Sequence, residues 1–444
     1  MKYLIFYTFL FGIFGCYSHE YPNIISSIKV EKNKLYIMPE KSFTQDFLRE
    51  STFFIEYEPT TNLTKLPFSI VTVPFVMCMM PIIWASNRTW TINSIDKELY
   101  ESLKVLRSVF KLFYPSLSWE GDLVPKKIKM NASKQVKDSK HISVLFSGGL
   151  DAVCSSFRHN NKEQLLITLH GYDVPFGKKT MWHNVQQQCQ GFADKYGHQI
   201  SFIHFNFRSV INVQKLAKIS KEIPVWIEYT SEALSHIGVA IPLLFERGYA
   251  KILMASSVTQ EYPFAYGTHP AIDNFIACAG INAFHDGVKL TRLEKVKTVK
   301  KIAENQHIAK PVLRVCWGND KQGGNCCMCE KCLRTMHEIL ILGEDLATWG
   351  FNCSLKELKH NTEKFLETKP YIGSNWFEVQ EHSTKLIAKK NKKVASYFEW
   401  FKTLDLHSLH TISATLELRR TLFTKLWKIG KKRNQQALLD TVHF

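Results

Sequence analysis

The middle of the chain alternates short apolar runs with longer amphipathic stretches, and this alternation limits the fold more than any other feature of the sequence. From residue 141 onward there are four apolar runs of 5 to 8 residues: ISVLF, LLITLHG, ISFIHFNF and KILMAS. Amphipathic stretches such as TMWHNVQQQCQGFADKYG and SEALSHIGVAIPLLFERGY separate them. Nearly continuous apolar strands joined by helices are typical of a parallel sheet covered on both faces. The sequence therefore predicts an α/β fold whose ligands bind beyond the carboxyl ends of the strands.

The segments on either side of this region have other patterns. The N-terminal part mixes strand-like runs with one long helix, which we expect to begin near Ser94, with Glu98 in its first turn. Residues 126–140 are polar and without periodicity, as is typical of a linker. The sequence thus predicts three parts: an N-terminal α+β extension (1–138), a central parallel-sheet domain (139–345) and a C-terminal helical, basic extension (346–444).

Two apolar segments raise the question of a membrane. The first sixteen residues, MKYLIFYTFLFGIFGC, resemble a short signal peptide or a lipoprotein start, but a buried first strand or a misplaced start codon would read the same way. Residues 66–85 are long enough to span a bilayer, yet prolines at 67, 74 and 81 would interrupt a helix. We expect short buried strands and turns there. We also expect a cytoplasmic protein without a membrane span, because the chemistry described below needs ATP and reduced thiols.

The composition restricts the class of protein and of partner. Apolar residues make up 45% of the chain, which excludes a disordered protein. The eleven cysteines are an odd number in a long chain, which argues against a secreted disulfide framework. Lys and Arg number 57 against 40 Asp and Glu, for a formal net charge of +17. This charge favours an anionic partner such as a nucleotide, a nucleic acid or an acidic protein, although a solvated surface would also account for it.

A glycine pair follows the first of the four apolar runs. The sequence Ser147-Gly148-Gly149-Leu150-Asp151 lies between that run and a helical stretch. Glycines let backbone N–H groups turn toward a ligand, and the N-terminus of the next helix favours an anion. The Ser147 hydroxyl adds a donor, and Asp151 could cap the helix or hold Mg²⁺ against phosphates. Because neither G-x-x-x-x-G-K-[ST] nor G-x-G-x-x-G is present, we expect a phosphate site of another kind, with an ordinary turn as the alternative.

Four cysteines near residue 325 have the spacing of a metal site. Their pattern is C-x₉-C-x₂-C-x₂-C, formed by Cys316, Cys326, Cys329 and Cys332. Four thiolates complete a tetrahedral zinc site, and C-x₂-C spacing lets one turn supply two ligands. We therefore expect one structural Zn²⁺, with Cys327 as a spare thiol. An iron–sulfur cluster is the alternative, but the Cys-Pro that follows such motifs in ferredoxins is missing.

The two motifs together resemble a known enzyme family. SGGLDA is similar to the S-G-G-x-D-S signature of the PP-loop ATP pyrophosphatases, whose fold is HUP-like, as in the adenine nucleotide alpha hydrolases. These enzymes transfer AMP from ATP to a substrate oxygen and expel pyrophosphate. This chain departs from the signature at Ala152, where the family usually has Ser, and we consider Ser155 and Ser156 as candidates to replace that hydroxyl. The resemblance implies that Ser147, Gly148, Gly149, Leu150 and Asp151 bind MgATP.

Within that family, a PP-loop followed by four zinc cysteines resembles QueC, the 7-cyano-7-deazaguanine synthase. The resemblance covers about residues 141–340 and includes an Arg soon after the last cysteine, here Arg334. QueC-type enzymes adenylate the carboxylate of 7-carboxy-7-deazaguanine, which ammonia then attacks, and a second ATP takes the amide to the nitrile. The resemblance therefore implies an ATP-dependent ligase that acts on a deazapurine acid.

The resemblance also suggests site residues between the two motifs. TRLEKV is similar to the K-x-E segment of QueC, which makes Arg292, together with Asp151, a candidate catalytic residue; Arg292 would steady phosphates or the adenylate. His170 and Asp173 follow the second apolar run, near the expected nucleotide edge, which makes His170 a candidate ATP-binding residue, although an ordinary strand-end loop would look the same. The loop that should hold the deazapurine differs from that of QueC and offers four candidates, which would stack on or hydrogen-bond the heterocycle: Tyr262, Tyr266, His269 and Asp273.

The long extensions suggest a partner. QueC itself is a compact single domain, so this chain resembles the longer QueC-like proteins of bacterial anti-phage systems such as Qat and type IV CBASS. These are thought to join the deazaguanine acid to the N-terminal amine of a partner protein. The resemblance thus implies a protein amine or a co-encoded defence protein as partner. Two alternatives stay open: a tRNA-modifying PP-loop enzyme, which would bind nucleic acid, and a non-catalytic nucleotide-binding subunit.

Overall fold

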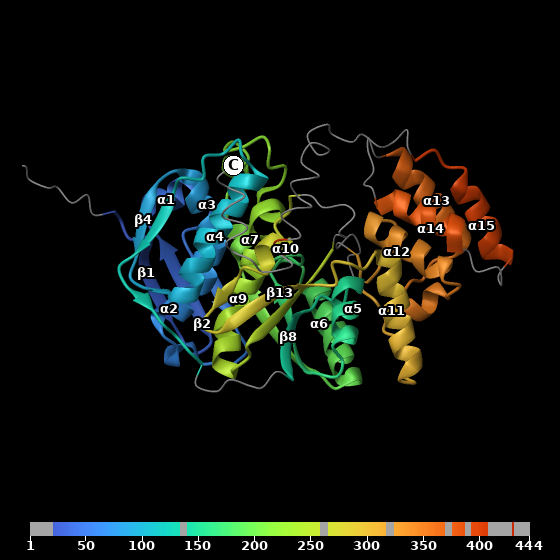
Figure 1. Cartoon of the computed structure of the whole chain (residues 1–444), viewed down its shortest axis with the longest axis horizontal. Coiled ribbons are helices and arrows are strands. Elements are labelled where there is room, and N and C mark those ends of the chain that lie inside the picture. The colour runs from blue at the N-terminus through green and yellow to red at the C-terminus, as the bar shows by residue number, and fades with distance from the viewer. Residues whose placement is uncertain are drawn as a thin grey trace, which may run out of the picture.

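A nine-stranded mixed sheet forms the centre of the molecule (Figure 1). The computed structural model describes residues 21–133, 140–257, 265–316, 324–368, 375–386, 392–406 and residue 429. Across the sheet the strands follow the order β1 (Ile25–Val30), β2 (Lys34–Pro39), β3 (Phe53–Glu56), β10 (Gln199–Phe205), β9 (Glu163–His170), β8 (His141–Leu145), β11 (Lys251–Ala255), β13 (Ile281–Asp286) and β12 (Ala277–Cys278).

The five strands in the middle of the sheet, from β10 to β13, run parallel to one another. Four of them are the predicted apolar runs, so the predicted parallel sheet is confirmed. The chain builds the sheet outward from β8 through β9 to β10, and then returns to add β11 and β13 on the other side of β8. The strand order therefore reverses next to β8, where an α/β sheet of this kind binds its ligands.

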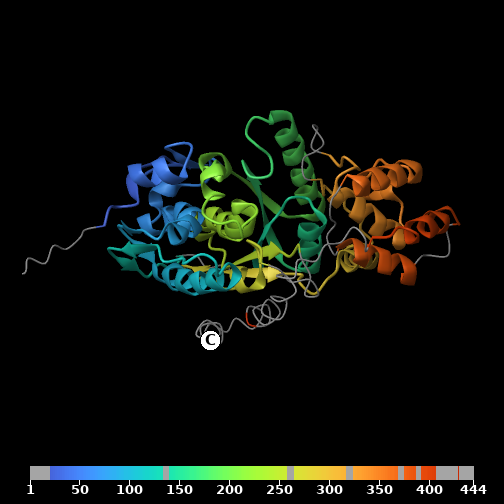
Figure 2. The same ribbon diagram turned by 90° about the horizontal axis from the view of Figure 1, so that it is seen from above.

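Helices cover both faces of the parallel strands. The helices α5 (Leu150–Arg158) and α6 (Lys179–Tyr196) lie on one face, and α9 (Glu232–Arg247) lies on the other (Figures 1 and 2). Successive residues of β9 alternate between the two cores, since Leu165 and Ile167 belong to the α9 side and Leu166 to the α6 side. Both faces of β9 are therefore apolar, which explains its continuous apolar sequence.

The N-terminal part adds three strands to this sheet. Strand β3 pairs antiparallel with β10, with Ile55 opposite Phe205, and β2 and β1 follow outward. The long helix α4 (Lys97–Phe113) begins two residues later than expected, because the carboxylate of Asp96, not Ser94, accepts the cap hydrogen bond from Leu99 N. Two small parallel ladders complete this part: β4 (Thr89–Ile92) with β6 (Asp122–Pro125), and β5 (Ile95–Asp96) with β7 (Ile128–Lys129).

The prediction of strands and turns for residues 66–85 was wrong. The segment forms the short helix α2 (Phe68–Val71) and the helix α3 (Val73–Ser86), which is buried along almost its whole length. Pro74 lies in the first turn, where its missing N–H costs nothing, and α3 tolerates Pro81 because tertiary packing surrounds it. Helix α9 passes close by: a Cβ on Gly238 would meet Met77 Cβ at 2.7 Å. In the described part of the chain no helix has the length and apolarity needed to cross a membrane.

The C-terminal region is helical, as predicted, wherever the structure describes it. It packs on the α5 and α6 side of the sheet and continues the same apolar core. Its main helices are α12 (Glu330–Ile341), η3 (Leu346–Trp349), α13 (Leu355–Glu367), α14 (Asn375–Leu386) and α15 (Lys392–Lys402). The other short helices are α1 (Lys41–Phe47), η1 (Leu63–Lys65), α7 (Phe207–Val210), α8 (Val213–Leu216), η2 (Ile227–Ser231) and α10 (Pro270–Asp273), with the longer α11 (Arg292–Asn305). Residues 1–16, the candidate signal segment, lie outside the described residues.

Candidate functional site

The glycine pair forms a tight turn between β8 and α5, as its sequence predicts. Gly148 has φ +74°, a left-handed conformation that side chains rarely adopt, and Gly149 is the N-cap of α5 without any side-chain cap. The segment before the cysteines fixes the turn, because Arg314 N donates to Gly148 O at 2.8 Å and Arg314 Nε donates to Ser147 O at 3.2 Å. We call residues 146–149 the glycine loop. Gly149 and the first residues of α5 line the pocket described next.

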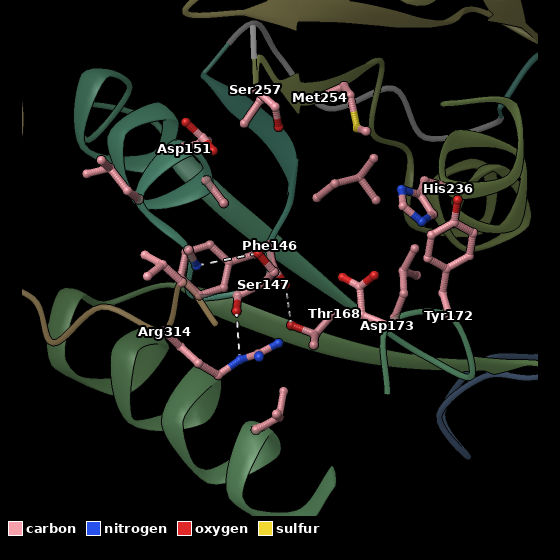
Figure 3. A pocket seen from close by; sticks show the side chains of 18 of the residues that line it. Phe146, Ser147, Asp151, Thr168, Tyr172, Asp173, His236, Met254, Ser257 and Arg314 are labelled. Atoms are coloured by element: carbon pink, nitrogen blue, oxygen red, sulfur yellow. Dashed lines mark hydrogen bonds between the residues drawn. The ribbon is translucent and has the colours of Figure 1, made fainter. Parts of the chain in front are cut away.

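A pocket opens at the carboxyl ends of β8, β9 and β11, next to the point where the strand order reverses (Figure 3). The glycine loop and the start of α5 line it through Ser147, Gly149, Leu150 and Asp151. In Figure 3, Tyr172 and His236 lie together at the end of the pocket away from Asp151. The glycine loop therefore lies at a cavity, and not in an ordinary surface turn.

Asp151 lies in the first turn of α5 between two cations. Lys295 Nζ donates to its Oδ1 at 2.7 Å, and Arg292 Nη2 lies 3.4 Å from its Oδ2. The three side chains are between 4% and 13% exposed, so solvent screens these charges weakly. Burial by itself raises the pKa of Asp151, but the charges of Lys295, Arg292 and Lys331 outweigh it and hold the pKa well below its usual value. Asp151 is thus an ionised carboxylate held by a cationic cluster.

Further cations line the same pocket. Arg292 also donates to Thr335 Oγ1 on α12 at 3.1 Å, which fixes its guanidinium near the start of α5. Arg314 and Lys331 line the pocket too, and Lys331 lies between Cys329 and Cys332 in the sequence. Positive side chains and a helix N-terminus around one cavity favour an anionic ligand.

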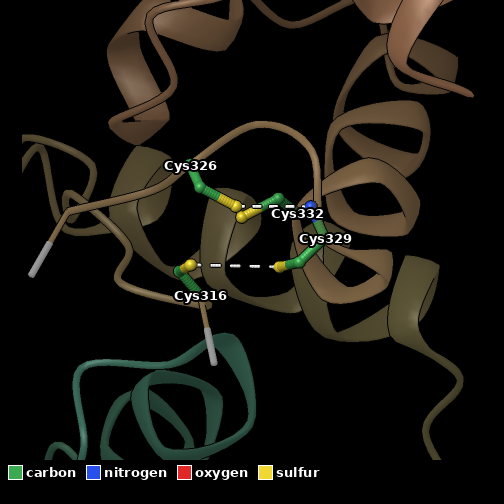
Figure 4. A group of neighbouring side chains, drawn as sticks. All are labelled: Cys316, Cys326, Cys329 and Cys332. Atoms are coloured by element: carbon green, nitrogen blue, oxygen red, sulfur yellow. Dashed lines mark hydrogen bonds between the residues drawn. The ribbon is translucent and has the colours of Figure 1, made fainter. Parts of the chain in front are cut away.

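The four predicted cysteines come together in one cluster (Figure 4). Their sulfur atoms all lie within 4.8 Å of one another, and Cys316 Sγ and Cys329 Sγ are 3.9 Å apart. Tetrahedral Zn²⁺ with bonds of about 2.3 Å places its sulfur ligands about 3.8 Å apart. Two backbone N–H groups, of Met328 and Cys329, also point at Cys326 Sγ, at 3.4 and 3.3 Å. The cluster could therefore bind a zinc ion.

Cys327 belongs to a different environment, as expected for a spare thiol. Its φ is +56°. Its sulfur lies 3.9 Å from Asn352 O and is hydrogen-bonded to the thiol of Cys353. The turn through Cys327 lets the flanking cysteines face the cluster. Because Cys316 and Lys331 line the pocket, the four-cysteine site and the glycine loop share one wall of the cavity.

The side chains after Asp151 do not replace the missing hydroxyl. Ala152 lines the pocket, so its methyl group stands where the PP-loop signature would place a Ser. Ser155 Oγ donates to Asp286 Oδ2 at 2.6 Å and Ser156 Oγ donates to Gln164 Oε1 at 2.7 Å. Both hydroxyls are buried on the far sides of α5, and neither side chain lines the pocket.

The structure does not bring His170 to the pocket. Its ring stacks on Trp182 of α6 at 4.1 Å, and its Nδ1 lies 2.8 Å from Nδ1 of His204. Burial, with the neighbouring His204, lowers the pKa of His170 to about 4. Asp173, three residues later, does line the pocket and is exposed at its mouth.

Of the four residues expected to hold a heterocycle, Tyr262 lies outside the described residues. His269 and Asp273 are fully buried and do not line the pocket. His269 caps α10 through Ala271 N. Asp273 accepts from Thr268 Oγ1 at 2.7 Å and lies 2.6 Å from His285 Nδ1, whose Nε2 lies 2.8 Å from Ser256 Oγ. These bonds hold the end of β11 and leave no polar atom of Asp273 for a ligand.

Tyr266 has an indirect relation to the pocket. It is hydrogen-bonded to the carboxyl of Glu232, which does line the cavity. Burial and the nearby carboxylates raise the pKa of Tyr266 far above its usual value, so the phenol stays neutral. Tyr266 therefore does not line the pocket itself, but its hydrogen bond positions Glu232, which does.

Several residues of the pocket were not predicted from the sequence. Lys295 had a signal, since it follows Arg292 by three residues and so shares its helix face. Glu232 and His236 are four residues apart and also share a face of their helix, α9, but nothing local separates them from a solvated helix face. Lys331 lies between Cys329 and Cys332, and the metal-site motif does not indicate a role for it. Comparison with family models, with curated proteins and with solved structures finds no match to this chain.

Proposed function

We propose that this protein is an ATP-dependent, adenylating enzyme of the PP-loop type. The observation that carries the proposal is the position of the Ser-Gly-Gly loop: it follows the strand at which the sheet order reverses, and it leads into a helix whose N-terminus opens on a cationic pocket. Backbone donors there suit the β- and γ-phosphates of ATP as a leaving group. No lysine follows the glycines to serve γ-phosphoryl transfer as in a P-loop.

In the proposed reaction a carboxylate oxygen of the substrate attacks the α-phosphorus of ATP. The bond between the α- and β-phosphates breaks, and pyrophosphate leaves with its charge held by the glycine loop. Arg292 would steady the phosphates or the acyl-adenylate. An amine then attacks the acyl carbon and AMP departs. Any amine that is held next to the acyl carbon can act as the nucleophile, because positioning supplies much of the rate.

Magnesium would accompany the phosphates, and carboxylate oxygen is the ligand type that it prefers. Asp151 is our proposed protein ligand. Because Lys295 and Arg292 already hold both of its oxygens, one of these cations would have to turn to the phosphates when Mg²⁺ arrives. Zinc would stay structural, as its four thiolates leave no open position for substrate.

The resemblance to QueC supplies the finer proposal. The acid would be 7-carboxy-7-deazaguanine, and the amine would be ammonia or the N-terminus of a partner protein in a bacterial anti-phage system. We propose a cytoplasmic setting, where ATP and reduced thiols are available. The long extensions support a protein amine, since a large substrate needs a docking surface.

The test is the fate of labelled ATP. Purified protein is incubated with Mg²⁺, α- or γ-labelled ATP and 7-carboxy-7-deazaguanine, with and without ammonia. We expect AMP and pyrophosphate in equal amounts. ADP and free phosphate would contradict the proposal, and an RNA-dependent reaction with a steep salt dependence would favour a tRNA-modifying enzyme instead.

A non-catalytic nucleotide-binding subunit is the second candidate. The methyl group of Ala152 in the pocket wall and the paired state of Asp151 both favour it. Such a subunit would bind ATP but would release no pyrophosphate, whichever acid is added. An Ala152→Ser variant that gains activity would show that only the hydroxyl was lacking.

A further inference from the structure

The residues that line the pocket belong to the cores on both sides of the sheet, and we call the two ends of the pocket its arms. One arm, next to α6, is lined by Val185 and Val315, which belong to the α6-side core. The other arm, next to α9, is lined by Leu145 and Met254 of the α9-side core, and by polar residues of α9 and of the loop after β9. The glycine loop lies where the arms meet. A pocket lined from both sides of the sheet would suit two ligand parts that meet at the glycine loop.

The α9-side arm contains polar atoms that lack partners within the described residues. The hydroxyl of Tyr172 and Oε2 of Glu232 are both buried and unbonded there. His236 lies against Tyr172, with ring centroids 4.2 Å apart and planes at 70°. Buried polar atoms are rarely left unpaired in proteins, because each costs about 1–3 kcal/mol. Two such atoms at one end of a cavity indicate a ligand that supplies the missing bonds.

The groups in this arm are neutral near pH 7, apart from the exposed carboxylate of Asp173 at the mouth. Burial, reinforced by Asp173, raises the pKa of Glu232 to about 8, so its carboxyl carries a proton that it can donate. Burial lowers the pKa of His236 to about 4, so its ring has one donor and one acceptor nitrogen. The arm therefore does not suit a phosphate. It suits an uncharged group with hydrogen-bond donors and acceptors.

The walls of the arm decide the shape of that group. Leu145, Ile167 and Met254 are apolar, and the aromatic rings of Tyr172 and His236 close the end. A flat ring can lie against such walls while its edge meets the polar atoms. The opposite arm offers apolar walls and the backbone-bound Arg314, which suits the ribose and base of a nucleotide.

From these observations we infer that Tyr172, Glu232, His236 and Asp173 form a recognition site for the polar edge of a neutral, planar heterocycle. A ring N–H faces the Asp173 carboxylate, and a ring acceptor receives the protons of Glu232 and Tyr172. The acid group of the same molecule points to the glycine loop. The inference rests on the proposed function for the identity of that acid, and it replaces the loop of Tyr262, Tyr266, His269 and Asp273 as the recognition site.

The probe for the test is 7-deazaguanine, which has the heterocyclic edge but no carboxylate and so binds without any reaction. Its affinity is measured by calorimetry on the full-length protein, alongside that of a non-hydrolysable ATP analogue. Tyr172→Phe removes an unbonded hydroxyl, so it should leave the melting temperature unchanged or higher. We expect it to weaken 7-deazaguanine binding roughly 3- to 10-fold and to leave the ATP analogue unaffected.

The second variant, Glu232→Gln, tests the proton. The charged and titratable groups around Glu232 are Asp173, Tyr266, Lys331 and Asp273. In the proposed complex the protonated carboxyl of Glu232 donates a hydrogen bond to the ligand. Binding by the parent should therefore fall as the pH rises through about 8, whereas the Gln variant should bind with no such fall. Glu246→Gln is the matched control, since Glu246 is on the same helix and the new amide oxygen can still accept from Asn62 N.

Three results would overturn the inference. Both variants could bind 7-deazaguanine as the parent does, with the same pH profile; the parent could fail to bind it at millimolar concentration; or the variants could weaken the ATP analogue equally, which would place adenine in this arm. The labelled-ATP reaction is a separate measurement. If the protein binds 7-deazaguanine but releases no pyrophosphate, the recognition site stands and the proposed enzymatic activity is refuted. If it releases pyrophosphate but does not bind 7-deazaguanine, the activity stands and the recognition site is refuted.

Discussion

The pairing of Asp151 with Lys295 allows a quantitative prediction. The Asp151→Asn substitution removes a carboxylate that accepts from Lys295 at 2.7 Å and lies 3.4 Å from Arg292, in a place where the three side chains are almost buried. Loss of one partner of a buried pair costs roughly 3–5 kcal/mol. The Asn oxygen can still accept one hydrogen bond, so we expect about 3 kcal/mol, near the lower end. The measurement is urea unfolding followed by circular dichroism.

A double-mutant cycle separates the pair from its surroundings. Lys295→Met alone should destabilise the protein by a similar amount, because it leaves the carboxylate with Arg292 only. The double variant should lose less than the sum of the two, by at least about 1 kcal/mol. Lys297→Met is the control: it is exposed on the same helix and should change the stability by less than about 0.5 kcal/mol. Strict additivity of the two single changes would refute the ion pair.

The pH dependence gives a further check on Asp151. Burial raises its pKa, but the neighbouring cations lower it by more, so the folded state holds this proton less readily than the unfolded chain. Its contribution to stability is then complete above the ordinary Asp pKa of about 3.9 and is lost as the pH falls below that value. The difference in unfolding free energy between the parent and Asp151→Asn should be constant above about pH 5 and should shrink below about pH 4. A constant difference down to pH 3 would contradict this reasoning.

Other predictions concern the metal and the glycines. Cys329→Ser should abolish the binding of about one zinc per chain and lower the melting temperature, while Met328→Ser, at an exposed neighbour, should do neither; iron with visible absorbance in the parent would contradict the zinc assignment. Gly148→Ala should destabilise the protein by about 1–2 kcal/mol because of its positive φ, whereas Gly191→Ala, in open space on α6, should stabilise it by about 0.5–1 kcal/mol. Thermal denaturation of both variants is the check, and equal effects would argue against a strained loop. Gly238→Ala should cost about 1–3 kcal/mol by forcing the backbone of α3 at Met77 away from α9, and an unchanged melting temperature would contradict this tight contact between the two helices.

Local patterns predicted much of the fold. The parallel strands were visible because both of their faces are buried, so their apolar runs are unbroken. The glycine pair and the cysteine spacing were visible because each depends on a few neighbouring residues. The pairing of β3 with β10 was not visible, since the partners are far apart in the sequence and edge pairing leaves no local mark. Residues 73–86 were misread because prolines count against a helix, whereas tertiary packing decided the outcome.

The site was harder to predict than the fold. His269 and Asp273 are of the right chemical type for a ligand, but neither lines the pocket: Nδ1 of His269 caps α10, and the Asp273 carboxyl holds His285. Glu232 was overlooked because only the three-dimensional arrangement shows that one of its oxygens is buried beside a cavity. A side chain's type suggests what it can bind, and its remaining hydrogen-bonding capacity, which the sequence does not reveal, decides whether it does.

The pairing of β3 with β10 also bears on how the chain becomes folded. Glu56 pairs with His204, 148 residues further along, so the first three strands leave the ribosome long before the strand that they flank. Helix α3 has most of its helix contacts with α9, so the side of α3 that α9 covers stays exposed until α9 has been synthesised. At about 5–20 residues per second, synthesis of the intervening segment takes on the order of ten seconds. Contacts of such long range slow folding and leave apolar surface open to aggregation. During this interval the nascent N-terminal part is a natural client for a chaperone.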